Sequence, residues 1–119
     1  MKEEPAGARG EKMGSNIPEL TVGSSGKTIP LVGFGTAEFP LGASPGTMKE
    51  SILHAMKLGY RHFDSAAIYQ SEQIIGEAIA DALRLGFIKS RDELFITSKL
   101  WCSNAHRHLV LPALRQTLE

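Results

Sequence analysis

The sequence predicts an α/β fold, and within that class the first few units of a (β/α) barrel. Predicted strands at 31–36, 60–64 and 94–100 alternate with helical segments, an order typical of successive right-handed βαβ units with a parallel sheet. An open dinucleotide-binding sheet would carry G-x-G-x-x-G after its first strand, but GFG at 33–35 is followed by TAE. The missing third glycine favours a barrel.

A tail and a hairpin precede these units. Residues 1–16 mix both charges with Gly and Pro and lack an apolar core, so we expect a disordered tail and not a secretory signal. Either Met1 or Met13 can start this tail, and the sequence leaves the choice open. Residues 20–22 and 28–32 flank the turn-rich sequence GSSGK, which predicts a β-hairpin.

Two helices are predicted between the strands. The first starts at Thr47, which has the capping-box spacing to Glu50, and ends at Gly59, a residue that readily adopts the left-handed conformation of a helix end. The second follows Ser71 as its cap, carries an apolar stripe at 3.6-residue spacing and ends at Gly86. Each helix therefore has one face that can pack against a sheet.

The C-terminal part predicts one more strand and helix. Residues 94–100 should form a strand with a buried first half, after a polar turn at 90–93. Asn104 can cap a short initial turn, while Pro112 fits only the first turn of the main helix. We therefore expect residues 17–119 to form one partial domain, a hairpin plus about three βα units, truncated before a fourth strand.

Composition restricts the partners and the compartment. Thirteen Lys and Arg balance thirteen Asp and Glu, so no net field attracts nucleic acid, and no apolar run approaches the roughly 20 residues that span a membrane. Cys102 is the only cysteine, which suits a reducing compartment, so we expect a cytoplasmic protein. The four histidines and Cys102 lack the spacing of a zinc site, so we expect no metal.

The polar residues with chemical potential lie at strand ends. Asp64 ends the second predicted strand, Tyr69 lies in the loop after it, and Lys99 lies at the end of the third. Taken singly, such an Asp is often a turn former, a Tyr a pocket wall and a Lys a solvent-exposed side chain. Parallel barrel strands end on one face, where barrel enzymes place their active sites, so the three side chains should converge.

Such a trio suits proton donation. A free tyrosine has a pKa of about 10 and is a weak acid near neutrality, but an adjacent ammonium favours the phenolate. Lys99 is placed to supply that charge, and Asp64 to hold the lysine protonated. Tyr69 then becomes the proton donor for a carbonyl oxygen that gains negative charge.

Four segments resemble the aldo-keto reductase family. They occur in the family's order, and the resemblance runs from about Ile17 to Glu119. The sequence GASPG is similar to plant members that act on phenolic, alkaloid or polyketide carbonyls. The matching segments are VGFGT at 32–36, GYRHFDSA at 59–66 followed by Tyr69, GEAI at 76–79 and ITSKLW at 96–101.

This resemblance implies a (β/α)8 barrel that binds NADPH in extended form without a Rossmann motif. Asp64, Tyr69 and Lys99 match three members of the family's catalytic tetrad, whose histidine belongs to a fourth strand not reached before Glu119. The cofactor contacts that the resemblance implies are Gly35, Thr36, Ala37 and Asp64. The positions that match the family's substrate pocket are Ala37, Ile68, Tyr69 and Trp101.

The implied function is reduction of an aldehyde or ketone to an alcohol by hydride transfer from NADPH. The partner is then a small carbonyl substrate, the full-length form is expected to be a monomer, and the 119-residue chain is an incomplete and inactive copy. The alternative is a short non-catalytic protein that retains the start of the fold as an interaction partner. A barrel isomerase or lyase would need no NADPH, and the set of Asp64, Tyr69 and Lys99 argues against it.

Overall fold

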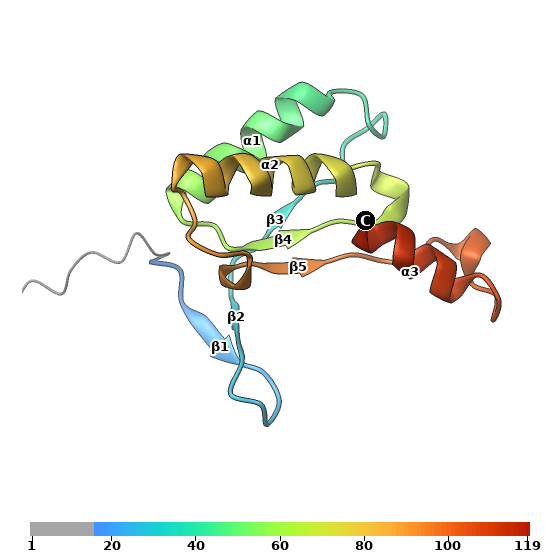
Figure 1. The fold of residues 1–119 in the computed structure, drawn as a ribbon, viewed down its shortest axis with the longest axis horizontal. Helices are drawn as coiled ribbons and strands as arrows, with labels where there is room; N and C mark the ends of the chain where they lie inside the picture. The colour runs from blue at the N-terminus through green and yellow to red at the C-terminus, as the bar shows by residue number, and fades with distance from the viewer. Residues whose placement is uncertain (1–15) are drawn as a thin grey trace, which may run out of the picture.

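The computed structural model describes residues 16–119, so residues 1–15 of the predicted tail lie outside the described residues. Strands and helices follow one another in the predicted order (Figure 1). The elements are β1 (Glu19–Thr21), β2 (Thr28–Pro30), β3 (Phe34–Gly35), α1 (Pro45–Leu58), β4 (His62–Asp64), α2 (Glu72–Leu85), β5 (Phe95–Thr97) and α3 (Val110–Leu118). Short 3₁₀ turns lie at Ala67–Tyr69, Arg91–Glu93 and Cys102–Asn104.

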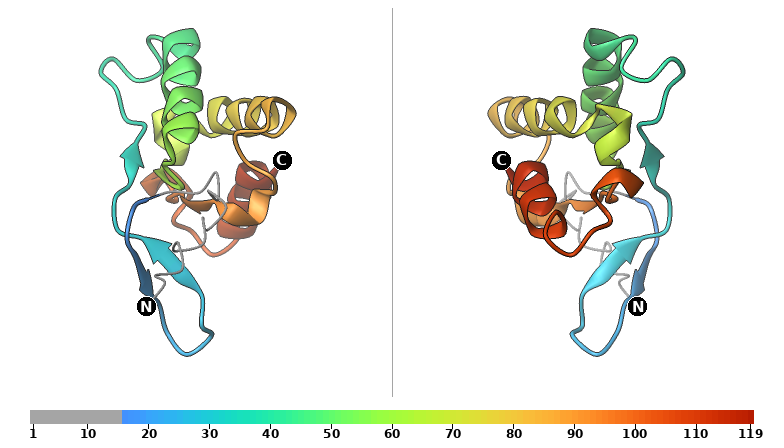
Figure 2. Two further views of the ribbon diagram at one scale, coloured as in Figure 1. Left: turned by 90° about the vertical axis from the view of Figure 1, so that its left-hand side faces the viewer. Right: turned by 90° about the vertical axis from the view of Figure 1, so that its right-hand side faces the viewer.

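The strands form two sheets. β1 and β2 pair antiparallel, so the predicted hairpin is observed. β3, β4 and β5 form a parallel sheet in that order, with Phe34 opposite Phe63 and Asp64 opposite Thr97. α1 and α2, which connect these strands, lie on the same side of the sheet (Figures 1 and 2). This is the predicted α/β arrangement of successive βαβ units.

The predicted helix ends are confirmed, but one helix start is wrong. Gly59 and Gly86 adopt the left-handed conformation, with φ of 103° and 76°. α1 begins at Pro45 rather than Thr47, because proline suits the first helical turn, where its missing N–H is not needed. No side chain caps the start of α1. α2 begins directly after Ser71, as predicted, but the Ser71 side chain makes no capping hydrogen bond.

The core lies between α1, α2 and one face of the parallel sheet. Phe63 in the middle of β4 is fully buried there, and the alternation of side chains along a strand puts His62 and Asp64 on the opposite face. The apolar stripes of both helices supply most of the rest, and the segment between α2 and β5 adds two residues to this core. Its other buried members are Ile52, Ala55, Met56, Ile75, Ala78, Ala82, Ile88 and Leu94.

Arg61 joins the ends of the two helices at the amino end of β4. Its guanidinium donates to the carbonyl of Met56 at 2.7 Å and to that of Phe87 at 3.0 Å, and its Nε lies 3.6 Å from Glu93 Oε2. Burial lowers the pKa of Arg61, and the charge of Glu93 opposes that shift. The buried guanidinium therefore hydrogen-bonds to one carbonyl in the last turn of α1 and to one just beyond the end of α2.

The strands are shorter than the predicted segments. β3 covers only Phe34–Gly35 of the predicted residues 31–36, and β5 covers only Phe95–Thr97 of the predicted residues 94–100. The first half of residues 94–100 was predicted to be buried. This prediction is confirmed for Leu94, which is 8% exposed, and is wrong for Phe95, which is 38% exposed. Phe95 is the register partner of His62, with ring centroids 5.1 Å apart, and therefore faces away from α1 and α2.

The segment after β5 leads into α3. Pro112 lies in the first turn of α3, as predicted, whereas Asn104 ends the preceding 3₁₀ turn instead of capping it. His106 and His108 lie between the two elements with stacked rings, their centroids 6.3 Å apart. α3 lies near the carboxyl end of β5 (Figure 1).

Candidate active site

The carboxyl ends of β4 and β5 bring Asp64, Tyr69 and Lys99 together. Asp64 is the last residue of β4, Tyr69 ends the 3₁₀ turn that follows, and Lys99 lies just after β5. The two strands are parallel neighbours, so their carboxyl ends lie at one edge of the sheet (Figure 1). The structure therefore places the three side chains together, while their catalytic roles stay predictions.

Lys99 is at the centre of this group. Its Nζ lies 2.7 Å from Asp64 Oδ2, 2.8 Å from the carbonyl oxygen of Ser65 and 3.5 Å from the Tyr69 hydroxyl. It also lies 4.8 Å from the centre of the Tyr69 ring. The first two contacts have the length of charge-assisted hydrogen bonds, and the third is at the outer limit of a hydrogen bond. The ammonium is thus held at the end of β4, next to the phenol.

The charge state of Lys99 is fixed chiefly by Asp64. The hydrogen bond from Lys99 to Asp64 raises the pKa of Lys99, partial desolvation opposes the shift, and the Tyr69 hydroxyl adds to it. Both side chains of the ion pair are partly open to water, with 45% of Lys99 and 40% of Asp64 exposed. A positive charge is therefore present beside the phenol at neutral pH.

Backbone hydrogen bonds extend the pairing of β4 and β5 beyond the strands. The N–H of Ser65 donates to the carbonyl of Thr97 at 2.7 Å, and the N–H of Ala67 donates to the carbonyl of Lys99 at 3.1 Å. These bonds continue the parallel ladder to the positions where the charged side chains project. The backbones that carry Asp64 and Lys99 are thereby fixed relative to each other.

A buried cluster of three hydroxyl groups lies behind Asp64, and the sequence analysis did not predict it. Thr36, Ser65 and Ser71 are 0%, 1% and 1% exposed. Ser71 Oγ lies 2.7 Å from Thr36 Oγ1 and 2.8 Å from Ser65 Oγ, and Thr36 Oγ1 donates to the carbonyl of Asp64 at 2.9 Å. The only sequence signal was three hydroxyl residues near the carboxyl edge, each of which alone fits a strand end or a helix cap.

The residues expected at the cofactor differ in what they present. A Cβ on Gly35 would meet no atom within 4 Å, and Ala37 is exposed, so both positions are open to a ligand. The Thr36 hydroxyl is committed to the buried cluster, which leaves its backbone as the part that a ligand can contact. All three follow one another from the end of β3, and Gly35 is the register partner of Asp64.

Two of the four residues expected in the substrate pocket share a cleft. Ile68 and Trp101 line a cleft of about 250 Å³, and Trp101 is 44% exposed. The other lining residues are Ala67, Glu72, Asn104 and three residues of α3. Ala37 and Tyr69 do not line this cleft. The assignment of all four residues to one substrate pocket stays a prediction.

The loop between β3 and α1 packs against Gln70, the residue after Tyr69. Gln70 has a left-handed φ of 57°, and Gly42 in the loop has a φ of 68°. A Cβ on Gly42 would lie 2.6 Å from Gln70 Oε1. A side chain at position 42 would therefore be strained and would also displace Gln70, so glycine allows the loop that begins at Ala37 to approach the site.

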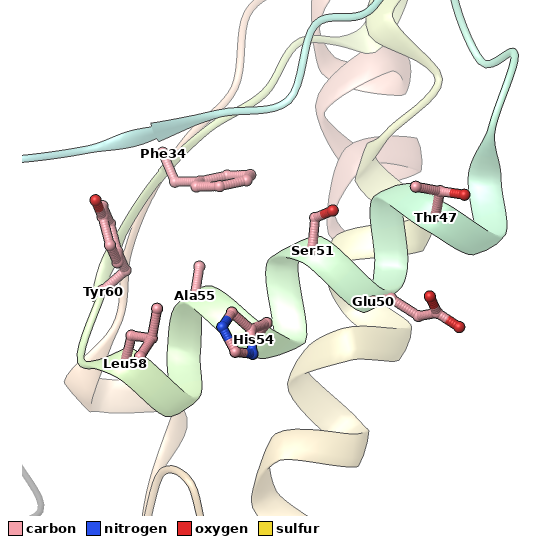
Figure 3. A pocket seen from close by; sticks show the side chains of 8 residues that line it. All are labelled: Phe34, Thr47, Glu50, Ser51, His54, Ala55, Leu58 and Tyr60. Atoms are coloured by element: carbon pink, nitrogen blue, oxygen red, sulfur yellow. The ribbon is translucent and has the colours of Figure 1, made fainter.

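A larger groove lies away from Asp64, Tyr69 and Lys99. It measures about 520 Å³ and is lined by α1, by β3 and by Tyr60. Figure 3 shows Phe34 and Tyr60 on one side of it, facing Ala55 and Leu58 of α1. Neither Asp64, Tyr69 nor Lys99 lines this groove, so it is separate from the candidate active site.

Within residues 16–119, no group of three or more His, Cys, Asp or Glu side chains is placed to hold a metal ion. In this same part of the chain, every helix is too short or too polar to cross a membrane. Cys102 is a free, exposed thiol.

Comparison with known proteins identifies the family. The model described as "Aldo/keto reductase family" matches residues 31–119, which include β3 to α3 and all three residues of the candidate site. The chain belongs to the aldo/keto reductase family. This confirms the resemblance that the four sequence segments indicate, and it identifies an enzyme family for the chain.

The chain is similar to aldo/keto reductases of plants. It is 61% identical over 107 residues to the (1S)-1,7-diacetoxy-luvungin A aldo-keto reductase of Citrus sinensis. This match covers 90% of this chain and 33% of that protein. It is 59% identical over 106 residues to the NADPH-dependent codeinone reductase 1-4 of Papaver somniferum, with coverages of 87% and 32%. The chain thus spans about a third of the length of these relatives.

A solved aldo/keto reductase shares the fold. The crystal structure of the Bombyx mori aldo-keto reductase in complex with NADP matches with a TM-score of 0.75 at 38% identity, over 86% of this chain and 33% of that chain. The family and this structure imply a TIM-barrel fold, of which the described residues form an α/β part. The names of the poppy and silkworm proteins support NADPH as the family's cofactor.

Proposed function

We propose that this chain forms the first part of an NADPH-dependent reductase that converts an aldehyde or ketone to an alcohol. Tyr69 is the proton donor, Lys99 the ammonium beside it and Asp64 the carboxylate that holds Lys99. The observation that carries the proposal is the position of Lys99 Nζ, 2.7 Å from Asp64 Oδ2 and 3.5 Å from the Tyr69 hydroxyl. Membership of the aldo/keto reductase family supports the reaction class.

In this mechanism the Tyr69 hydroxyl donates its proton to the carbonyl oxygen of the substrate as that oxygen gains negative charge. Lys99 stabilises the phenolate left behind, because a nearby opposite charge favours the charged form of an acid. Asp64 orients Lys99 and keeps it protonated, as the third member of a catalytic triad orients its base. The chemistry that NADPH supplies when bound is the hydride for the carbonyl carbon.

The residues at the end of β3 fit the nicotinamide part of such a cofactor. Gly35 leaves open space, Ala37 is exposed, and the partly exposed carboxylate of Asp64 lies at the same sheet edge. We assign Gly35, Ala37, Asp64 and the backbone of Thr36 to contacts with the nicotinamide and its ribose. In barrels, phosphate groups usually bind at the seventh and eighth strands, which lie outside the described elements.

The substrate is proposed to be a small molecule with an aromatic or extended carbonyl group. The plant relatives support this class, since one acts on codeinone by its name. Ala37, Ile68, Tyr69 and Trp101 are proposed to line the pocket, and the cleft shared by Ile68 and Trp101 supports half of that set. A methyl side chain at position 37 leaves more room than a larger residue would.

We assign β3, β4 and β5 to the first three strands of the eight-stranded barrel. The first strand of a closed barrel pairs with the last, so the open edge of β3 needs a partner. The groove between Phe34, Leu58 and Tyr60 lies beside this edge, and its apolar lining suits the packing of the last βα unit (Figure 3). A closed barrel has no free sheet edge, which supports a monomeric full-length form, and the single cysteine supports the cytoplasm.

A non-catalytic interaction partner is the second candidate function. The outer edges of β3 and β5 have no strand partner among residues 16–119, and exposed edges can pair with another chain. This candidate requires that the chain binds an intact reductase subunit. It predicts co-purification with that subunit and no contribution of Tyr69 to turnover.

The reductase proposal is tested on a chain in which the barrel is completed. Residues 1–119 are joined within α3 to the remaining two thirds of the poppy codeinone reductase, and this completed chain is assayed for NADPH oxidation with codeinone. The proposal predicts turnover that Tyr69→Phe abolishes and that Lys89→Ala, at an exposed position outside the site and outside both clefts, leaves intact. A completed chain that melts cooperatively but has no turnover contradicts the proposal.

A further inference from the structure

The hydrogen bonds among the three buried hydroxyls have one direction. Thr36 Oγ1 donates to the carbonyl of Asp64, and a hydroxyl has only one proton to donate. The 2.7 Å contact between Thr36 and Ser71 must therefore have Ser71 as its donor, and the 2.8 Å contact then has Ser65 as the donor to Ser71. The bonds run from Ser65 through Ser71 and Thr36 to the Asp64 carbonyl. We call this series the hydroxyl chain.

Both ends of the hydroxyl chain lie on the segment Asp64–Ser65, which contributes the carboxylate of the ion pair with Lys99. At one end, the Asp64 carbonyl accepts from the hydroxyl and also from the N–H of Thr36, at 3.0 Å. At the other end is Ser65, whose own carbonyl accepts from Lys99 Nζ at 2.8 Å. The hydroxyl chain therefore closes a ring around the backbone from which the Asp64 carboxylate projects and to which Lys99 is bonded.

The Ser71 hydroxyl does not serve α2. Serine directly before a helix usually accepts a hydrogen bond from a backbone N–H of the first turn, and that cap stabilises the helix. Ser71 makes no such bond and is 1% exposed, with its hydroxyl between Thr36 and Ser65. Because no buried side-chain polar atom of the described residues lacks a partner, the cluster is fully satisfied as it stands.

We propose that Ser71 is a positioning residue for the reduction reaction, which holds the Asp64 carboxylate and the Lys99 ammonium in place through the hydroxyl chain without touching either charge. This inference rests on the proposed function. Loss of the Ser71 hydroxyl leaves the buried Ser65 hydroxyl without its acceptor and removes the bond that Ser71 donates to Thr36, so the Asp64–Ser65 segment loosens. The bonds from Lys99 to this segment then weaken.

The test compares three variants of the completed chain. Ser71→Ala removes the hydroxyl, Ser71→Thr keeps it, and Ile75→Val, one turn further along α2 in the core, lowers stability without touching the hydroxyl chain. The readouts are kcat, KM, NADPH affinity and the pKa of Lys99. That pKa is measured from the pH dependence of the rate at which an amine reagent modifies Lys99. Among the described residues, Asp64 and Tyr69 are the titratable groups that act on Lys99.

Ser71→Ala is expected to lower kcat by roughly 3- to 10-fold, the effect of one lost hydrogen bond, with NADPH affinity nearly unchanged. The pKa of Lys99 should fall toward its ordinary value, because Asp64 holds it less firmly. Ser71→Thr should recover most of the rate. Ile75→Val should keep both kcat and the Lys99 pKa while melting at a lower temperature.

Two results overturn the inference while leaving the reductase proposal intact. One is a Ser71→Ala enzyme with unchanged kcat and unchanged Lys99 pKa. The other is an equal loss of kcat in Ile75→Val, which would reduce Ser71 to a structural role. If the unsubstituted completed chain has no turnover, the proposed function fails and the role of Ser71 in the reaction fails with it. The Lys99 pKa then decides only whether the hydroxyl chain holds the ion pair: a fall in Ser71→Ala supports that contact network, and no fall overturns it.

Discussion

Lys99 Nζ and Asp64 Oδ2 lie 2.7 Å apart, which joins the end of β5 to the end of β4 in one ion pair. The side chains are 45% and 40% exposed, so water screens the pair and its contribution to stability is small. Its main effects are on orientation and charge, because it directs the ammonium toward Tyr69 and favours its protonated form. The proposed proton-donor role of Tyr69 depends on this pair.

Asp64→Asn is expected to lower the pKa of Lys99, because the hydrogen bond to Asp64 is the largest cause that raises it. A folded-state pKa above the unfolded value stabilises the fold below the unfolded pKa, and this contribution is lost as the pH rises through the folded pKa. The part of the stability difference between Asp64→Asn and the unsubstituted completed chain that comes from the raised Lys99 pKa should therefore vanish in strongly alkaline solution. NMR titration of the Lys99 side chain measures the shift directly, and an unchanged pKa would refute this role of Asp64.

Lys99→Met removes the positive charge beside the phenol. Turnover should fall sharply, and the pH profile of the remaining rate should shift, because the ammonium no longer favours the phenolate. The control is Lys89→Met, an exposed lysine outside the site. A profile of Lys99→Met that matches that of the control would count against the pairing of Lys99 with Tyr69.

Ala37→Tyr tests the proposed pocket wall. The larger side chain should discriminate against the bulkier of two carbonyl substrates by roughly 1–3 kcal/mol in kcat/KM, the usual range for contacts in an apolar pocket. The measurement is the ratio of kcat/KM for a large and a small substrate in both enzymes. An equal effect on the two substrates would remove Ala37 from the pocket.

A polypeptide of residues 1–119 produced alone is expected to show no cooperative thermal transition and no saturable NADPH binding. The outer edges of β3 and β5 would be unpaired, and Leu31, Leu58 and Trp101 are among the large apolar side chains exposed at 58%, 65% and 44%. Calorimetry and fluorescence titration with NADPH measure the two properties. A sharp two-state melt together with micromolar NADPH affinity would be the opposite result.

Much of the architecture was predictable because it depends on local signals. The helix ends follow from Gly59 and Gly86, whose left-handed conformation costs little without a side chain. The parallel sheet follows from the alternation of strands and helices, since such connections are right-handed and place successive strands side by side. From that rule alone, Asp64 and Lys99 were expected to meet at one edge.

Other features were not predictable from neighbours in sequence. At the start of α1, Thr47 with Glu50 competed with Pro45, and the preference of proline for the first helical turn decided between the two signals. The hydroxyl chain joins residues up to 35 positions apart, so no local pattern indicates it. The exposure of Phe95 depends on which face of the sheet lacks a covering helix, which the apolar character of the residue does not reveal.

Tyr69→Phe in the completed chain tests the central claim most directly, because it removes one hydroxyl oxygen and leaves the ring beside Lys99. The measurement combines steady-state turnover with NADPH affinity by fluorescence titration. The account predicts that turnover is abolished while NADPH binds almost as tightly as before, since the hydroxyl acts on the substrate oxygen and not on the cofactor. Near-normal turnover by Tyr69→Phe would show that Tyr69 is not the proton donor and would contradict the account.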